Sequence, residues 1–253
     1  MTTIAVLGLG EAGALVAADL VAVGVTVRGF DPVAPAPTGV LACGSETEAV
    51  TGAELVLSIN TGGVALDVAR AAAGGCAPGT LFADLNSTSP GRKREIAAVL
   101  PDGVRFVDGV LMSTVPGKGL YVPMAVAGPG AVAFAEAMGI LGAKVTVVGE
   151  ETGAAAARKL VRSVFFKGLA AAVTESVAAA RAAGMEAAIV EEIGRELASA
   201  DTGLVDVLLE GSRLHAVRRA QEMESAIELL DELGVPPRIS TASRDWLHDL
   251  AAD

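Results

Sequence analysis

A glycine-rich turn near the start of the chain constrains the fold more than any other feature. Gly8, Gly10 and Gly13 follow the apolar run Ile4–Leu7 and open a predicted helix over about residues 11–23. In such a turn the first glycine permits a tight bend, the second lets a pyrophosphate approach the backbone, and the third lets helix and strand pack closely. The free N–H groups of the helix N-terminus favour phosphate. The pattern predicts a dinucleotide site formed by Gly8, Leu9, Gly10, Glu11, Ala12 and Gly13. The alternative is a glycine-rich turn without a ligand.

An acidic residue follows the second predicted strand, Val25–Phe30. Asp31 stands 18 residues after Gly13. A carboxylate at this position accepts hydrogen bonds from the adenosine ribose and repels a 2′-phosphate. We therefore expect NAD as the cofactor, with NADP possible. Arg28 is expected to point away from Asp31 or to be held inside the fold. Asp31 could also serve as a turn-forming residue before Pro32, and the two roles are compatible.

Strand and helix patterns alternate along the first part of the chain, with helical stretches of about ten residues separating several strands. Further strands are predicted at Leu55–Ile59, Thr80–Asp84, Val104–Asp108, Tyr121–Ala127 and Lys144–Val148, with a helix over Ala131–Leu141. Apolar residues make up 52% of the chain but aromatic residues only 3%, which suits parallel strands covered by Ala-rich helices better than a β-sandwich. The sequence predicts an α/β fold with a Rossmann-type, doubly wound, mostly parallel sheet.

The pattern changes after Gly149, because no strand is predicted beyond it. A stretch without proline predicts one long bridging helix over about residues 152–183, with Gly168 as the place of any kink. Shorter helices follow. We expect two domains, a dinucleotide-binding domain over 1–152 and an all-helical substrate and dimerisation domain over 153–253 that completes the active site. A helical, Ala-rich domain of this size has little core of its own, which favours a homodimer.

The excess of acidic over basic residues limits which partners the chain can bind. The net charge of −11 disfavours nucleic acid, whose phosphates need clustered Lys and Arg. Cys43 and Cys76 lie far apart, so we predict no metal site and two thiols in a reducing compartment. No signal peptide is evident, and charges or glycines are expected to break every long apolar run. We therefore expect a cytoplasmic protein without a membrane partner.

Two basic clusters interrupt this acidic chain. Residues 152–174 contain no acidic residue, and the clusters are Arg158, Lys159, Arg162 and Lys167, then Arg213, His215, Arg218 and Arg219. Lys159, Ser163 and Lys167 are four residues apart and so line one stripe of the long helix. The clusters favour a cleft for a small anionic substrate such as a carboxylate or phosphate. A solvated helix face is the alternative.

The chain resembles the β-hydroxyacid dehydrogenases and their 6-phosphogluconate dehydrogenase-like relatives over nearly its whole length. Gly8–Gly13 is similar to the Gly-Leu-Gly-x-Met-Gly of that superfamily, and Asp84–Pro90 to its Asp-x-Ser-Thr-x-x-Pro segment near the nicotinamide. Phe106–Thr114 occupies the place of its Phe-x-Asp-Ala-Pro-Val-Ser-Gly-Gly substrate loop. Gly153–Lys159 resembles the segment that carries its catalytic lysine. The segments after Lys159 and His215 look like a poorly characterised 6-phosphogluconate dehydrogenase-like branch.

The resemblance implies roles for particular residues. Lys159 would be the catalytic acid/base, and Ser163 stands where the family usually has Asn, to hydrogen-bond the substrate hydroxyl or hold the lysine. Asn60 and Asn86 would contact the cofactor, and Ser87 would help to position it. The family's Ser-Gly-Gly is replaced here, and the expected substrate-binding residues are Met112, Ser113, Thr114, Arg162, Lys167 and His215. Ordinary turn chemistry before Pro116 is the alternative for Ser113 and Thr114.

These features predict an NAD(P)-dependent oxidoreductase that transfers a hydride between the nicotinamide and a small hydroxy acid or its keto form. A lysine serves as the base if burial and nearby positive charge lower its pKa. One alternative is an imine reductase or sugar-phosphate dehydrogenase of the same architecture, although a retained lysine argues against a typical imine reductase. The other is a non-catalytic nucleotide-binding regulator, which would not need Lys159.

Overall fold

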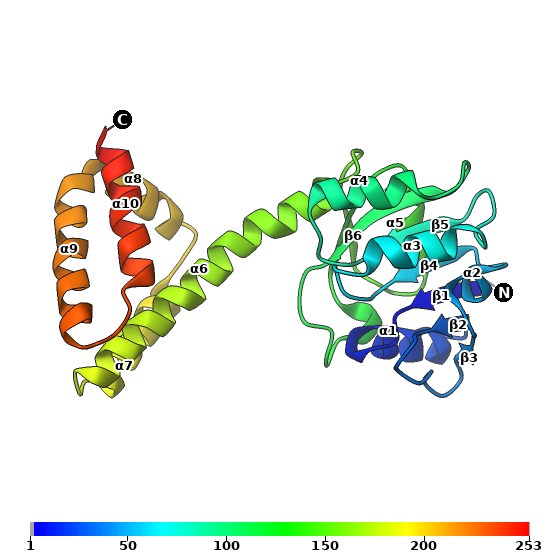
Figure 1. The fold of residues 1–253 in the computed structure, drawn as a ribbon, viewed down its shortest axis with the longest axis horizontal. Coiled ribbons are helices and arrows are strands. Elements are labelled where there is room, and N and C mark those ends of the chain that lie inside the picture. Colours follow the sequence, from blue (N-terminus) through cyan, green and yellow to red (C-terminus); the bar gives the residue numbers. More distant parts are fainter. Residues whose placement is uncertain (1–2, 253) are drawn as a thin grey trace. The chain divides into compact units, whose positions relative to one another are not determined.

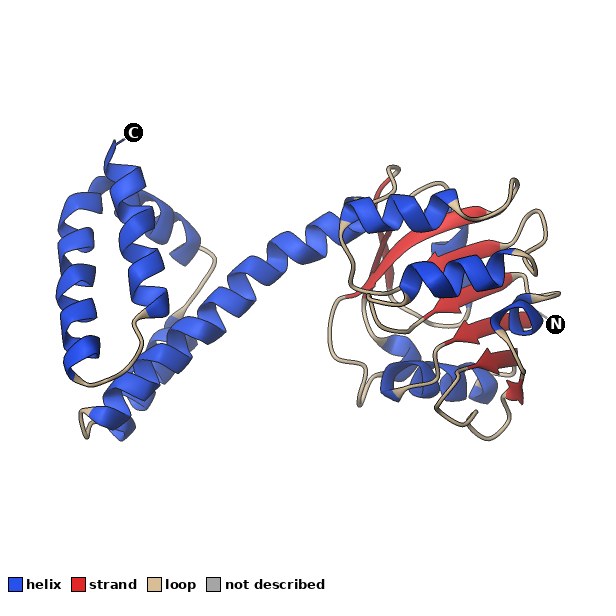
Figure 2. Cartoon of the chain, viewed as in Figure 1, coloured by secondary structure: helices blue, strands red, loops and turns tan. Residues whose placement is uncertain are grey.

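The computed structural model describes residues 3–252, and its first part is a mostly parallel sheet. The strands are β1 (Thr3–Leu7), β2 (Thr26–Phe30), β3 (Leu41–Ala42), β4 (Leu55–Ser58), β5 (Leu81–Asp84), β6 (Arg105–Leu111), β7 (Met124–Ala127) and β8 (Val145–Gly149). Their order is β3-β2-β1-β4-β5-β6-β7-β8, and Figure 2 shows them as arrows between helices. The first six strands are parallel, whereas β7 pairs antiparallel with β6. The order 3-2-1-4-5-6 is that of doubly wound dinucleotide-binding folds, so the predicted fold class is confirmed.

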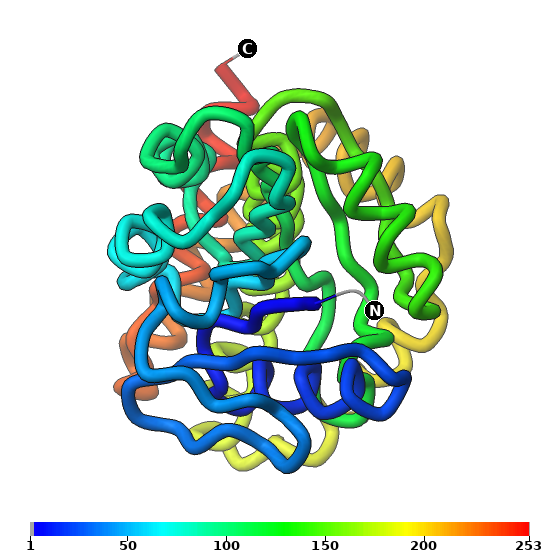
Figure 3. The backbone as a smooth tube through the Cα atoms, turned by 90° about the vertical axis from the view of Figure 1, so that its right-hand side faces the viewer, coloured from blue at the N-terminus to red at the C-terminus, as the bar shows by residue number. Residues whose placement is uncertain are grey.

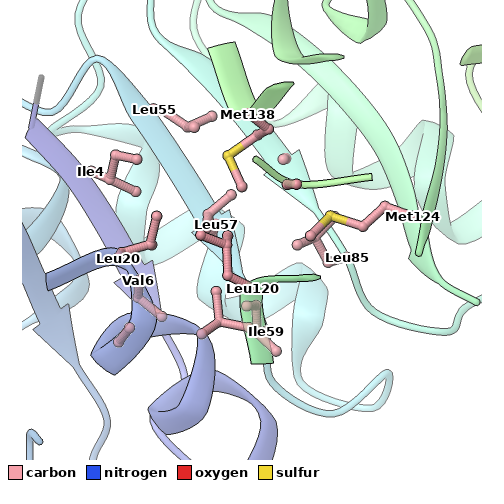
Figure 4. Close-up of a cluster of buried hydrophobic side chains, with 14 of the residues drawn as sticks. Ile4, Val6, Leu20, Leu55, Leu57, Ile59, Leu85, Leu120, Met124 and Met138 are labelled. Carbon is pink, nitrogen blue, oxygen red and sulfur yellow. The ribbon is translucent and has the colours of Figure 1, made fainter. Parts of the chain in front are cut away.

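Helices cover both faces of this sheet (Figure 1). On one face α1 (Glu11–Ala22) and α5 (Ala131–Ile140) pack on a core that includes Ile4, Leu57 and Met138, which Figure 4 shows. On the other face are α2 (Glu46–Val50), α3 (Ala65–Ala73) and α4 (Pro90–Ala98). Successive β1 residues enter opposite cores because strand side chains alternate between faces.

The contacts divide the chain at Arg162/Ser163, inside the helix α6 (Ala154–Ala182). The sequence places the boundary at 152/153, where this helix begins. The second unit continues with α7 (Glu186–Ser199), α8 (Leu204–Leu214), α9 (Ala216–Glu232) and α10 (Arg238–Ala252). Figure 3 traces the chain through α6 into these helices. Within residues 163–252 the buried apolar side chains are Ala180, Ala216, Ala220 and Leu230, so this unit has a small core.

Two sequence expectations differ from the structure, one on a strand and one on the long helix. The strand predicted from Tyr121 begins at Met124, because a short 3-10 helix, η1 (Gly119–Tyr121), precedes it. α6 runs without interruption through Gly168. Charges and Gly168 do interrupt the apolar run along this helix, but contrary to expectation they leave one window apolar enough to span a bilayer. By length and composition α6 could cross a membrane, since an 18-residue window has a mean hydropathy of 1.3 and only 11% of it is buried.

Candidate functional site

The three glycines of the first turn differ in their surroundings. Gly8 has a φ of +93°, and a Cβ there would lie 2.3 Å from the Ile59 carbonyl oxygen. A Cβ on Gly13 would lie 1.9 Å from the Gly8 carbonyl oxygen. Gly10 begins α1, and a Cβ there would have no atom within 4 Å. Packing therefore requires glycine at two positions, while the third leaves open space beside the helix N-terminus.

A pocket of about 660 Å³ adjoins this turn at the carboxyl ends of β1, β2 and β4. Gly8, Gly10, Glu11 and Ala12 line it, whereas Leu9 and Gly13 are buried. The charged residues in its lining are all acidic: Glu11, Asp31, Glu46 and Asp67. Its volume lies in the usual range of cofactor and small-molecule sites.

Asp31 is tied to the turn through both carboxylate oxygens. Its Oδ2 accepts a hydrogen bond from the Leu9 N–H at 2.8 Å, and its Oδ1 accepts from the N–H groups of Val33 and Ala34, each at 2.8 Å. Burial raises the pKa of Asp31, but these three backbone bonds outweigh it and leave the pKa below its ordinary value. The turn-forming role is therefore present, and Oδ2 retains a lone pair for a ligand. Arg28 is held by α2, since its guanidinium donates to the carbonyls of Glu48 and Ala49.

The two predicted asparagines are hydrogen-bonded to each other. The backbone N–H of Asn60 donates to Asn86 Oδ1 at 2.7 Å, and the Asn60 amide donates to Ser58 Oγ at 2.9 Å. Asn60 lines the pocket, and its buried Oδ1 has no hydrogen-bond partner within residues 3–252. Asn86 is buried and donates to Ser58 and to the Asp84 carboxylate. The asparagines therefore join the ends of β4 and β5 and leave an acceptor at the pocket.

Beneath this edge lies a buried ion cluster, which consists of Asp84, Lys93 and Asp108, all fully buried. Lys93 Nζ lies 2.7 Å from Asp84 Oδ2 and 3.6 Å from Asp108 Oδ1. It also donates to the carbonyls of Asp84 at 2.6 Å and Gly109 at 2.9 Å. Burial raises the pKa of Asp84 despite the opposing effect of Lys93. The cluster connects β5, β6 and α4.

The start of α6 is capped by Asp108. Its Oδ2 accepts hydrogen bonds from the N–H groups of Gly153, Ala155 and Ala156 at 2.9, 2.9 and 3.2 Å. One turn further along, Lys159 is partly buried and its Nζ donates to Ser87 Oγ at 2.6 Å. The predicted catalytic lysine therefore lies against the loop that follows β5. Ser163 is one helical turn beyond it on the same stripe of α6.

The predicted substrate loop follows β6. Met112 packs partly against a small core, and Ser113 and Thr114 are exposed. Lys118 donates to Ser113 Oγ at 2.5 Å, and Asp19 of α1 anchors the end of the loop by accepting from the Leu120 N–H. The remaining predicted residues are exposed: Arg162 and Lys167 on α6, and His215 between α8 and α9, the last two in the second unit.

Sequence reasoning missed several of these groups. Lys93 stands among Arg92, Arg94 and Glu95, a composition typical of a solvated helix face. Asp84 and Asp108 could have been paired, because each stands near the end of adjacent predicted strands, and they face each other in the sheet register. Lys118 belongs to no recognised sequence motif. The described residues contain no group of three or more His, Cys, Asp and Glu able to hold a metal.

Comparisons with known proteins show which proteins the chain is similar to. Residues 180–250 match the model of a domain of unknown function, DUF1932. A protein of Mycobacterium bovis named "probable 3-hydroxyisobutyrate dehydrogenase" is 41% identical over 105 residues, and the match spans 39% of this chain and only 36% of that relative. Proteins of the same name from Mycobacterium tuberculosis match equally.

Solved structures cover nearly the whole chain. A conserved hypothetical protein from Sinorhizobium meliloti 1021 is 30% identical, with a TM-score of 0.65 over 98% of this chain and 88% of that one. A conserved protein of unknown function, described as structurally similar to 3-hydroxyacid dehydrogenases, is 28% identical with a TM-score of 0.65, over 98% and 97%. A reductive aminase from Aspergillus terreus, solved with NADPH, has a TM-score of 0.81 over 98% and 93%, but at 18% identity this likeness concerns the fold alone.

The curated relatives named as 3-hydroxyisobutyrate dehydrogenases and the solved structure described as similar to 3-hydroxyacid dehydrogenases confirm the resemblance expected from the sequence. The chain therefore resembles the β-hydroxyacid dehydrogenase-like proteins with an NAD(P)-binding fold.

Proposed function

We propose that this chain is an NAD-dependent oxidoreductase that transfers a hydride between the nicotinamide and a small hydroxy acid or its keto form. The observation that carries the proposal is the 2.6 Å contact between Lys159 Nζ and Ser87 Oγ. Ser87 belongs to the loop after β5, in the same sheet whose first strand ends at the glycine turn. An acid/base group and a dinucleotide site on one sheet edge are the two parts that such a reaction needs.

The pocket at the glycine turn fits a dinucleotide. The open space at Gly10 and the N-terminus of α1 suit a pyrophosphate, and the unpartnered Asn60 Oδ1 suits a ligand hydroxyl. When bound, the nicotinamide ring would accept or donate the hydride. Leu9, Ala12 and Gly13 would shape the turn rather than contribute side-chain bonds.

The acidic lining supports NAD over NADP. A 2′-phosphate would meet Asp31 with Glu11, Glu46 and Asp67 in the same lining. The nearest basic side chain on β2, Arg28, is already bonded to α2 carbonyls. Arg70 pairs with Asp67 at 3.1 Å but does not line the pocket. The like charges of the other three carboxylates, Glu11, Asp31 and Glu46, disfavour the phosphate, whereas Asp31 can still accept a ribose hydroxyl.

Lys159 would act as the general acid/base on the substrate hydroxyl. Its contact with Ser87 holds the ammonium at the edge of the sheet, where Ser87 can pass or orient a proton. Ser163, one turn along, would contact the substrate or Lys159. Arg162 adds positive charge on the next turn of the same helix, which favours an anionic substrate.

The loop after β6 supports an anionic substrate as well. Ser113 and Thr114 are exposed hydroxyls, and Lys118 lies beside Ser113. In place of a Ser-Gly-Gly segment, the loop therefore offers side-chain donors, including an ammonium group.

The test is steady-state formation of reduced nicotinamide with NAD and a panel of small 2- and 3-hydroxy acids, followed by the reverse reaction with the keto acids. The proposal expects turnover with at least one hydroxy acid and none with simple amines. Turnover only with amines or imines would favour an imine reductase. Tight NAD binding without turnover on any panel member would favour a regulator.

A further inference from the structure

The interior of the first unit contains a charged group with no role in the chemistry above. Lys93 is fully buried, and its ammonium lies within 3 Å of three oxygens: Asp84 Oδ2, the Asp84 carbonyl and the Gly109 carbonyl. The ammonium donates hydrogen bonds to the two carbonyls, and Asp84 Oδ2 faces it as an ion-pair partner. Asp108 Oδ1 is a fourth oxygen, at 3.6 Å. Such a cluster is costly to desolvate and is weak evidence for stability alone.

One arm of the cluster leads to the loop that holds Ser87. Asp84 accepts from the Asn86 amide, and Asn86 in turn accepts from the Asn60 N–H. Ser87 is the next residue after Asn86. Lys93 therefore fixes, through Asp84, both sides of the gap between the ends of β4 and β5.

The other arm leads to the lysine. Asp108 accepts from three N–H groups of the first turn of α6, at Gly153, Ala155 and Ala156. Lys159 follows Ala155 and Ala156 by four and three residues, so it lies on the face of α6 above them. The N–H groups of this turn also help to balance the second carboxylate, since one ammonium cannot neutralise two.

We infer that Lys93 is a positioning residue that sets the contact between Lys159 and Ser87. Each partner of that contact is attached to the same buried ammonium, Ser87 through Asp84 and Asn86, and Lys159 through Asp108 and the first turn of α6. Loss of Lys93 removes the ammonium that faces the buried carboxylates of Asp84 and Asp108, and the Ser87 loop and the start of α6 then shift. The consequence for catalysis rests on the function proposed above, whereas the consequence for the two segments does not.

Lys93→Met tests this inference, because methionine keeps the length of the side chain and removes the ammonium. Arg92→Met is the matched control: it lies one residue away on α4 and its guanidinium pairs only with the exposed Glu95 among the interactions assigned to it. Amide hydrogen exchange is measured on the folded proteins, and kcat and NAD affinity are measured where turnover is found.

In Lys93→Met the amides of Gly153, Ala155 and Ala156 should exchange about tenfold faster or more, the factor expected when charge-assisted hydrogen bonds are weakened. The kcat should fall about 100-fold, as expected for a displacement of about 1 Å at a reacting group. NAD affinity should fall much less than kcat, since the Lys93 cluster reaches the pocket lining through Asn60, by way of Asn86 and Asp84, and not through the glycine turn itself. Arg92→Met should change none of these values.

Unchanged exchange at the start of α6, or unchanged kcat in a folded Lys93→Met protein, would overturn the inference, since a purely structural role changes stability without slowing the folded enzyme. If Lys93→Met does not fold, Asp108→Asn replaces it, with the same expectations for exchange and kcat. If the wild type turns over no substrate, the proposed function fails, and the exchange rates alone support or overturn the positioning of α6 by Lys93.

Discussion

Substitution of Lys159 by methionine should separate catalysis from cofactor binding and folding. Both residues favour helix and have similar length, so α6 should persist. The variant loses the hydrogen bond to Ser87 Oγ, whose contribution to stability is about 0.5–1.5 kcal/mol for a typical hydrogen bond and less for a partly exposed one. At about 2–4 °C per kcal/mol, the melting temperature should fall by less than about 6 °C. General acid/base catalysis contributes about 10²–10⁴-fold, so turnover should fall by at least the lower value.

The assay is steady-state formation of reduced nicotinamide, with melting temperature and NAD affinity measured on the same preparations. Lys167→Met is the matched control, since Lys167 lies two turns along the same stripe of α6, and it should lose much less activity. NAD affinity should be unchanged in both variants. If Lys159→Met retained most of its activity while Lys167→Met lost it, the base would stand on a different turn. If neither substitution mattered, the stripe would be a solvated face.

Further predictions concern the turn, a helix cap and assembly. Gly13→Ala should lower the free energy of unfolding by about 1–3 kcal/mol or more, because its Cβ would overlap the Gly8 carbonyl; urea unfolding measures this. Gly10→Ala should leave the free energy of unfolding unchanged and weaken NAD binding, which a titration with NAD measures. Glu175 accepts hydrogen bonds from Ile239 and Ser240 at the start of α10, and although burial raises its pKa, these bonds leave it below 4.5. The contribution of Glu175 to the free energy of unfolding is therefore fully present above pH 4.5 and is lost as the pH falls through its lower folded-state pKa. Glu175→Gln should therefore flatten the decline of stability below pH 4.5. Light scattering should show a homodimer at micromolar concentration, because α8 has no buried residue and exposes Leu208 and Leu209; a monomer would contradict this.

The fold could be predicted because its signals are local. Glycines at fixed spacing, apolar strands and an acid after the second strand each report on a few neighbouring residues. The expected helix over 11–23 is α1, and the long helix over 152–183 is α6. The short β3 and α2 were not predicted, since two and five residues carry too little periodicity to detect.

The site could be predicted only in part, because its missing members depend on contacts between distant segments. Lys159 and Ser87 are 72 residues apart; family motifs placed each of them near the site, but their contact was not predicted. Lys93 lies in a charged helix and is nonetheless fully buried, since the carbonyl ends of β5 and β6 and two carboxylates surround it. No pattern in a single sequence distinguishes such a lysine from its solvated neighbours.

Dinucleotide binding is the claim on which the rest of the account depends. Calorimetric titration of the wild type and of Asp31→Ala with NAD and with NADP measures it directly. The account predicts that the wild type binds NAD more tightly than NADP, and that Asp31→Ala narrows the difference by weakening NAD and relieving the repulsion of the 2′-phosphate. Tighter binding of NADP to the wild type, or binding of neither dinucleotide, would contradict it.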